Sequence, residues 1–241
     1  MPGIILWEGK SELDGKPIVL IAIEHSSNSK TGDMVQTYIL RSDIHPVEAM
    51  HSGEDHSICG NCTHKGATCY VNVAYGPSQV YKAYRAGRYQ KRDYVQFCRP
   101  VRLGTYGDPA AIPAFTWRYL MLREPNHTGY THQWKEKRFQ YLKEWCMASC
   151  DTHQEQQQAA SMGWRTFTVT PKGETRQELL CPASEELGHA TTCSTCLACG
   201  GTSSNVKANV YIPVHGSKGK VQLFNIEREN YDTRQTHRST L

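Results

Sequence analysis

Hydrophobic positions in the first part of the chain form short runs that are rich in β-branched residues. The run at 17–23 lies between polar turns and predicts a strand, and a second strand is expected at 35–40. The polar segment between them contains Lys30-Thr31-Gly32, but it lacks the preceding glycine and the following helix of a phosphate-binding loop. We therefore interpret this segment as a hairpin connection.

Farther along the chain, strand-like runs alternate with helix-like stretches at intervals of about twenty residues. Strands are expected at 101–106, 128–132, 145–149, 165–170 and 210–214, and helices from Pro77 onward and at 113–123, 135–144, 153–162 and 174–180. This alternation is typical of parallel β/α units joined by right-handed crossovers. The expected fold class is α/β, a partial or closed parallel β/α barrel of the TIM type. An open doubly wound sheet is the alternative, although no dinucleotide fingerprint follows a strand.

The chain of 241 residues is expected to form a single domain over 1–227, followed by a polar C-terminal tail at 228–241 that lacks periodicity. The longest apolar run, at 18–23, is too short to cross a bilayer, so no membrane association is expected. The first residues have neither the basic segment nor the long apolar segment of a secretory signal, which predicts a cytoplasmic protein.

Seven of the ten cysteines fall into two clusters, which are expected as insertions in the domain at 59–69 and 181–199. In a reducing compartment, such clusters indicate metal binding rather than disulfides. The first cluster reads Cys-x2-Cys-x6-Cys, and the second has one cysteine followed by Cys-x2-Cys-x2-Cys. The expected metal ligands are Cys59, Cys62, Cys69, Cys181, Cys193, Cys196 and Cys199.

The second cluster favours iron–sulfur chemistry. Three cysteines in close series are typical of [4Fe–4S] clusters, and the separate Cys181 can supply the fourth thiolate. Zinc usually takes paired Cys-x2-Cys motifs from two loops, and it stays open as the alternative metal. The three thiols of the first cluster leave a fourth position for a ligand or substrate, or for a further protein ligand. The candidates for that further ligand are Cys98, Cys146, Cys150 and His64.

The expected strands end in residues suited to catalysis. In β/α barrels the functional residues lie at the carboxyl ends of the strands, and four candidates stand there: Asp108, Tyr130, His132 and Asp151. Aspartate often caps a helix that follows a strand, so N-capping is the alternative role for Asp108 and Asp151.

The order of these motifs resembles a known family. Asn28-Ser-Lys30-Thr31-Gly32, the two cysteine clusters, Gly107-Asp108 and Gly129-Tyr130-Thr-His132 together resemble cysteine-rich bacteriophage proteins of the "gene product 88"-like group, over about residues 28–215. This resemblance implies a phage-encoded protein in the host cytoplasm. It does not imply an activity.

A more distant resemblance is to the radical S-adenosylmethionine enzymes, which combine a β/α barrel, three early cysteines and a glycine-containing acidic motif after the next strand. It implies that Cys59, Cys62 and Cys69 hold a catalytic [4Fe–4S] cluster with one iron open to S-adenosylmethionine. Gly107 and Asp108 would then help to hold this cofactor, with Lys30 as a further candidate, and the late cysteines would hold an auxiliary cluster. The usual spacing, Cys-x3-Cys-x2-Cys, differs from the spacing in this chain.

The expected function is an iron–sulfur enzyme that acts on a nucleotide or nucleic acid. The alternative is a non-catalytic nucleic-acid-binding protein, stabilised by zinc or a cluster and related to phage replication. A third interpretation is a structural protein whose metals only hold loops.

A net charge of +4 permits a nucleic-acid partner, and the segment 87–94 interleaves basic and aromatic residues, which can bind single strands or form a solvated face. A rolling-circle nickase is disfavoured because the His-x-His metal motif is missing, although Tyr81 and Tyr84 are expected on a helix.

Overall fold

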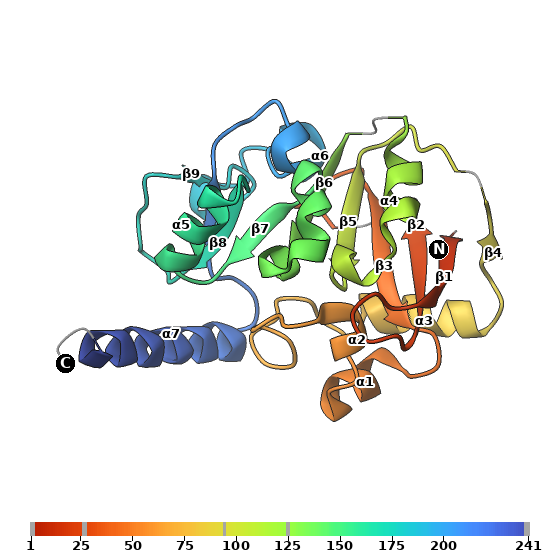
Figure 1. Cartoon of the computed structure of the whole chain (residues 1–241), viewed down its shortest axis with the longest axis horizontal. Helices are drawn as coiled ribbons and strands as arrows, with labels where there is room; N and C mark the ends of the chain where they lie inside the picture. The colour runs from red at the N-terminus through yellow and green to blue at the C-terminus, as the bar shows by residue number, and fades with distance from the viewer. Residues whose placement is uncertain (1–2, 26–27, 94, 124–125, 239–241) are drawn as a thin grey trace.

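The computed structural model describes residues 3–25, 28–93, 95–123 and 126–238, and its side chains are described as far as residue 228. Its central feature is a ten-stranded sheet in the order β4-β1-β2-β3-β5-β6-β7-β8-β10-β9 (Figure 1). The strands are β1 (Gly3–Lys10), β2 (Pro17–Ile23), β3 (Val35–Arg41), β4 (Gln90–Lys91), β5 (Val101–Tyr106), β6 (His127–Thr131), β7 (Met147–Cys150), β8 (Thr166–Thr170), β9 (Leu179–Leu180) and β10 (Val210–Pro213).

Most of the sheet is parallel. Strands β1, β2 and β3 pair antiparallel, whereas every neighbouring pair from β3 to β9 is parallel. Six of the parallel strands, β3, β5, β6, β7, β8 and β10, lie side by side in chain order. The expected α/β class with parallel β/α units is thus confirmed, and the sheet is not closed. The segment with Lys30 joins antiparallel β2 and β3, as expected for a hairpin connection.

Helices connect most of the parallel strands. The α-helices are α1 (Pro46–Ser52), α2 (His56–Cys59), α3 (Gly76–Arg85), α4 (Ala114–Met121), α5 (His153–Ser161), α6 (Cys193–Cys196) and α7 (Lys218–Arg238). Short 3-10 helices occupy Pro109–Ala111, Gln133–Lys135, Lys137–Glu144, Glu185–Leu187 and Gly201–Ser203. The helix expected at 135–144 is therefore a 3-10 helix within the described part of the chain.

The helix expected at 174–180 is wrong. In its place the polar residues form a turn-rich segment, in which Arg176 binds Glu174 and Gln156, and the two leucines at its end form β9. Only these two residues of the segment are apolar, so they cannot form a helical stripe, and they extend the sheet beside β10 instead.

The C-terminal tail is also more regular than expected. Where the sequence predicts an irregular tail from Arg228, helix α7 continues to Arg238, and 239–241 lie outside the described residues. Its first turns are held by Lys220, which donates to the carbonyl groups of Cys69 and Val71, and by Phe224, which is buried. Once these contacts fix the first turns, the helix can propagate at little further cost. Figure 1 shows α7 projecting from the body of the molecule.

The two faces of the parallel sheet carry different cores. On β7, Ala148 and Cys150 belong to the main hydrophobic core, together with residues of α4 and α5, whereas Met147 faces a second, smaller core. This second core contains Cys181 and Cys199. Because side chains alternate along a strand, the second cysteine segment (residues 181–199) covers the face opposite the helices. We call this face the inner face.

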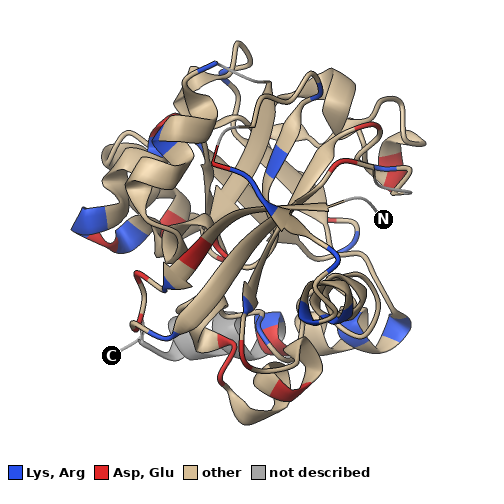
Figure 2. Ribbon diagram, turned by 90° about the vertical axis from the view of Figure 1, so that its right-hand side faces the viewer, with Lys and Arg blue, Asp and Glu red and all other residues tan. Residues whose placement is uncertain are grey.

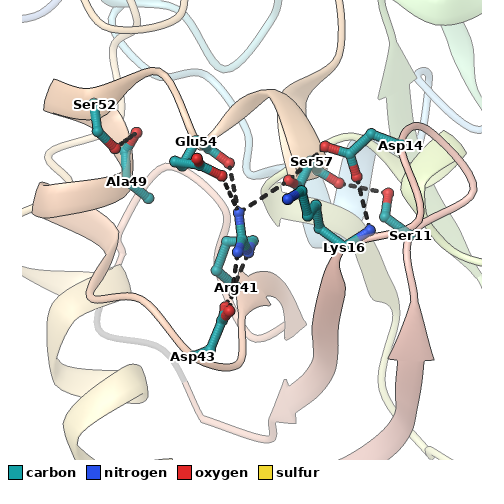
Figure 3. A network of polar contacts seen from close by, with 9 residues as sticks. All are labelled: Ser11, Asp14, Lys16, Arg41, Asp43, Ala49, Ser52, Glu54 and Ser57. Carbon is teal, nitrogen blue, oxygen red and sulfur yellow. Dashed lines mark hydrogen bonds and ion pairs between the residues drawn. The ribbon is translucent and has the colours of Figure 1, made fainter.

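A buried arginine fastens α2 to the end of β3 (Figure 3). Arg41 is 4% exposed, and its guanidinium group binds Asp43 at 3.0 Å, Glu54 at 2.6 Å and the Ser57 hydroxyl at 3.2 Å. The Ser57 hydroxyl in turn donates to Asp14 in the β1–β2 turn at 2.7 Å. Since α2 ends at Cys59, this network positions the start of the first cysteine loop (residues 59–69).

Gly107 allows the same helix to approach β5. Its φ angle of +85° is unfavourable for other residues, and an added Cβ would lie 2.7 Å from the Ile39 Cβ and 3.3 Å from the Ile58 carbonyl oxygen. Gly15 has a similar φ of +77° but nothing within 4 Å.

We expect Gly107→Ala to lower the free energy of unfolding by at least about 1 kcal/mol more than Gly15→Ala, because only the first adds a steric clash to the backbone strain. Urea unfolding of the two variants measures the difference. Equal losses in the two variants would contradict the close packing at Gly107.

Candidate metal and catalytic centre

The first cysteine loop lies in the long connection between β3 and β5. Its backbone is folded by hydrogen bonds from Cys62 N to the Cys59 carbonyl (3.2 Å) and from Cys69 N to the His64 carbonyl (2.7 Å). The buried amide of Gln133 donates to the Cys59 carbonyl at 3.2 Å and accepts from Asn61 N at 3.3 Å. The loop is thus anchored to the chain that follows β6.

The thiols of this loop lie close enough to influence one another's ionisation. Burial raises the pKa of Cys59 well above its usual value and that of Cys62 to about 12, and neighbouring thiols add to both effects. Burial also raises the pKa of Cys69. Forming thiolates here requires a nearby positive charge, which a bound metal would supply.

Asp108 lies at the carboxyl end of β5, as expected, and is 6% exposed. Its carboxylate accepts hydrogen bonds from Ala110 N at 2.9 Å, the Thr131 hydroxyl at 2.7 Å and His132 N at 2.8 Å. Burial raises its pKa, although these donors favour the charged form. Asp108 therefore caps the short helix Pro109–Ala111, the alternative role, and also holds the end of β6.

Asp151, at the end of β7, does not cap α5; the neighbouring Thr152 does. The Asp151 carboxylate instead contacts His64 Nε2 at 3.0 Å and accepts from the Thr63 hydroxyl at 2.6 Å. Burial works against the charge, but the bonds from His64 and Thr63 lower the pKa of Asp151 below its usual range. The structure thus brings the end of β7 into contact with the first cysteine loop.

His132 follows β6 and completes this group. Its Nε2 lies 3.7 Å from the Cys62 sulfur, and its ring packs edge-on against that of His64 with centroids 5.8 Å apart. Burial lowers its pKa, even though Asp151 and Asp108 oppose the shift. Asp108, His132 and Asp151 are therefore gathered beside the cysteine loop, as the position of strand ends predicts.

The second cysteine segment is fixed to the sheet and to the β2–β3 connection. Cys181 N donates to the Tyr211 carbonyl on β10 at 2.8 Å, and Gly129 N on β6 donates to the Cys199 carbonyl at 3.0 Å. Cys193 N donates to the Lys30 carbonyl at 3.1 Å. Burial raises the pKa of Cys181, and that of Cys199 to about 12.

Two cations accompany the second cysteine segment. Lys30 lies within electrostatic reach of Cys181 and Cys193, and burial lowers its pKa although these thiols oppose the shift. Arg102, on β5, is within reach of Cys193 and Cys199, and its guanidinium lies 5.6 Å from the centre of the Tyr130 ring.

Tyr130 belongs to this second group. It hydrogen-bonds Cys199, and burial raises its pKa well above the usual value. Side chains alternate along β6, so Tyr130 faces the inner side while Thr131 faces Asp108. The structure therefore separates Tyr130 from Asp108, His132 and Asp151, with which the sequence groups it.

The other candidates for a further ligand of the first cysteine set, apart from His64, lie elsewhere. Cys146 and Cys150 are buried in the main hydrophobic core, and Cys98 is exposed. Gly107 packs against β3 and α2, as described above, and so serves the fold.

The basic and aromatic segment 87–94 offers less to a nucleic acid than its sequence suggests. Tyr89 is buried in the main core, so it cannot stack on a base, and Tyr94 lies outside the described residues. In Figure 2, Lys and Arg are spread over several elements and alternate with Asp and Glu.

The sequence does not mark several residues of the centre as functional. Gln133, Thr63 and Arg102 follow neither a metal-ligand spacing nor a strand end, although Gln133 adjoins His132. Tyr70 connects the two cysteine sets: it follows Cys69, and its hydroxyl accepts a 2.6 Å hydrogen bond from Arg102.

No protein-family model, no curated protein and no solved structure matches the chain significantly. Within the part of the chain that the structure describes, no helix is both long and apolar enough to cross a membrane.

We expect Asp108→Asn to reduce the free energy of unfolding by about 1–3 kcal/mol, because the carboxamide cannot accept from all three donors and its NH2 group would face one of them. Urea unfolding measures the loss, and Asp93→Asn, at an exposed position, is the control. A variant as stable as the control would show that the Asp108 network does not hold the strand ends together.

Proposed function

We propose that this chain is an iron–sulfur enzyme of the radical S-adenosylmethionine type. One observation carries the proposal: the first cysteine loop follows β3, the first of six parallel strands in chain order. The loop is thereby placed beside Asp108, His132 and Asp151, at the ends of the next three strands of that series, and the Cys62 sulfur lies 3.7 Å from His132 Nε2. This is the arrangement expected of a partial β/α barrel with a catalytic cluster at its working edge.

In this proposal Cys59, Cys62 and Cys69 would hold the catalytic [4Fe–4S] cluster. All three cysteines are partly buried, and burial raises their pKa values, so a bound metal would favour their thiolates. Three thiolates leave one iron without a protein thiolate, so a cofactor can bind there. When bound, such a cluster supplies an electron to that cofactor.

In this proposal Cys181, Cys193, Cys196 and Cys199 would hold an auxiliary cluster with four protein ligands. Cys181 and Cys199 are held by backbone hydrogen bonds to β10 and β6, while Cys193 and Cys196 begin and end α6. The charges of Lys30 and Arg102 offset those of thiolates in this segment. Zinc bound by these four cysteines is the alternative. Lys30 and Arg102 would offset the thiolate charges in that case too.

For the substrate we propose a nucleotide or nucleic acid. Lys30 and His215 are in contact, with Nζ and Nε2 3.2 Å apart, and Tyr70 packs on the His215 ring at 5.8 Å. Together with Arg102, these side chains combine positive charge with aromatic surface, which suits a phosphate joined to a base. A phage-encoded protein in the host cytoplasm would meet this substrate class.

S-adenosylmethionine is the proposed cofactor. Asp108 is a weaker candidate for binding it than the sequence suggests, because its carboxylate already accepts three internal hydrogen bonds. We assign Asp108 the role of positioning His132, whose side chain lies beside Cys62.

Cys62→Ala should reduce the iron and acid-labile sulfide content of anaerobically purified protein by about half, because one of two clusters loses a ligand. Calorimetric binding of S-adenosylmethionine, expected for the wild type, should be lost as well. The exposed Cys98 provides the control, and Cys98→Ala should match the wild type in both measurements. Unchanged iron in Cys62→Ala would exclude Cys62 as a ligand.

Cys196→Ala should lower the melting temperature of metal-loaded protein, because the binding free energy of a fully ligated site contributes to folding. Thermal unfolding followed by circular dichroism, with Cys98→Ala alongside, measures the shift. If Cys196→Ala melts at the wild-type temperature, the second cysteine segment does not owe its structure to a bound metal.

A further inference from the structure

Three side chains from separate parts of the chain converge beside the first cysteine loop without belonging to its thiol set. His64 comes from the loop, His132 follows β6, and Asp151 follows β7. Within the described residues, one ligand atom from each can be chosen so that all three lie within 4.8 Å of one another. This spacing allows all three atoms to bind one metal ion.

Other hydrogen bonds orient these donors. His64 Nδ1 is 2.8 Å from the Thr68 hydroxyl, which directs Nε2 toward Asp151 Oδ1 at 3.0 Å. The Thr63 hydroxyl binds the other Asp151 oxygen at 2.6 Å, leaving Oδ1 to face the histidines. Metal-binding histidines and carboxylates are typically held by partners of this kind.

His132 is held through its backbone rather than its ring. Its N–H donates to Asp108 at 2.8 Å, and its ring nitrogen Nε2 faces Cys62. The side chains of His64 and Asp151 are 19% and 24% exposed, so an ion can reach them and keep positions open to solvent. Two imidazoles and one carboxylate with open positions are typical of catalytic mononuclear sites.

We propose that His64, His132 and Asp151 bind one divalent transition-metal ion, of the Fe²⁺, Zn²⁺ or Mn²⁺ class, separately from any metal at the cysteines. This site goes beyond the proposed function and does not depend on whether the thiols hold iron. An ion there would bind and polarise an oxygen of a ligand at the carboxyl ends of the strands.

Mn²⁺ is the appropriate probe because carboxylate ligands suit it, whereas thiolates select softer metals. Full-length protein is freed of loosely bound metal under anaerobic conditions and titrated with Mn²⁺, and the free ion is followed by electron paramagnetic resonance. The wild type should bind one Mn²⁺ per chain. Asp151→Asn and His64→Ala should each weaken binding at least about tenfold, while His51→Ala, at an exposed histidine of α1, should bind as the wild type does.

A second measurement uses the wild type alone and so does not depend on the folding of variants. Electron spin echo modulation of bound Mn²⁺ should show coupling to imidazole nitrogen. Bound Mn²⁺ without nitrogen coupling would overturn the proposal, as would a wild type that binds no Mn²⁺ at millimolar concentration. Folded variants with wild-type affinity would overturn it too. Iron and sulfide contents, measured on the same samples, report on the cysteine clusters independently.

Discussion

The carboxylate of Asp108 is the interaction on which the rest of the centre depends. It joins the end of β5 to the end of β6 through Thr131 and His132, and the backbone N–H of Asp108 donates to the Ile58 carbonyl at 2.6 Å. Ile58 precedes Cys59, so one residue sets the positions of a strand end, a histidine and the first thiol. Gly107 makes this possible because no larger residue fits between β5 and α2.

The two cysteine sets lie against different parts of the parallel sheet. The first lies at the carboxyl ends of the parallel strands, and the second packs on the inner face, where it forms a small core with Met147 and Ile212. Tyr70 links them, since it adjoins Cys69 and accepts a hydrogen bond from Arg102.

Periodicity predicted the parallel part of the sheet because buried positions alternate with less buried ones along its strands, as in β5 and β8. It did not predict the edge strand Leu179–Leu180 or helix α7, which depend on contacts with distant segments. The placement of Asp108, His132 and Asp151 at one edge was predictable, since the ends of parallel strands meet. That His64 joins them was not, because the path of the cysteine loop depends on Gln133 and on the Arg41 network.

The central claim is that the cysteines hold iron–sulfur clusters, and chemical analysis of anaerobically purified wild-type protein tests it most directly. Iron and acid-labile sulfide at about eight each per chain, in a brown protein, are the predicted result for two [4Fe–4S] clusters. A colourless protein that contains stoichiometric zinc and no sulfide would contradict the account and leave a protein whose loops are stabilised by zinc.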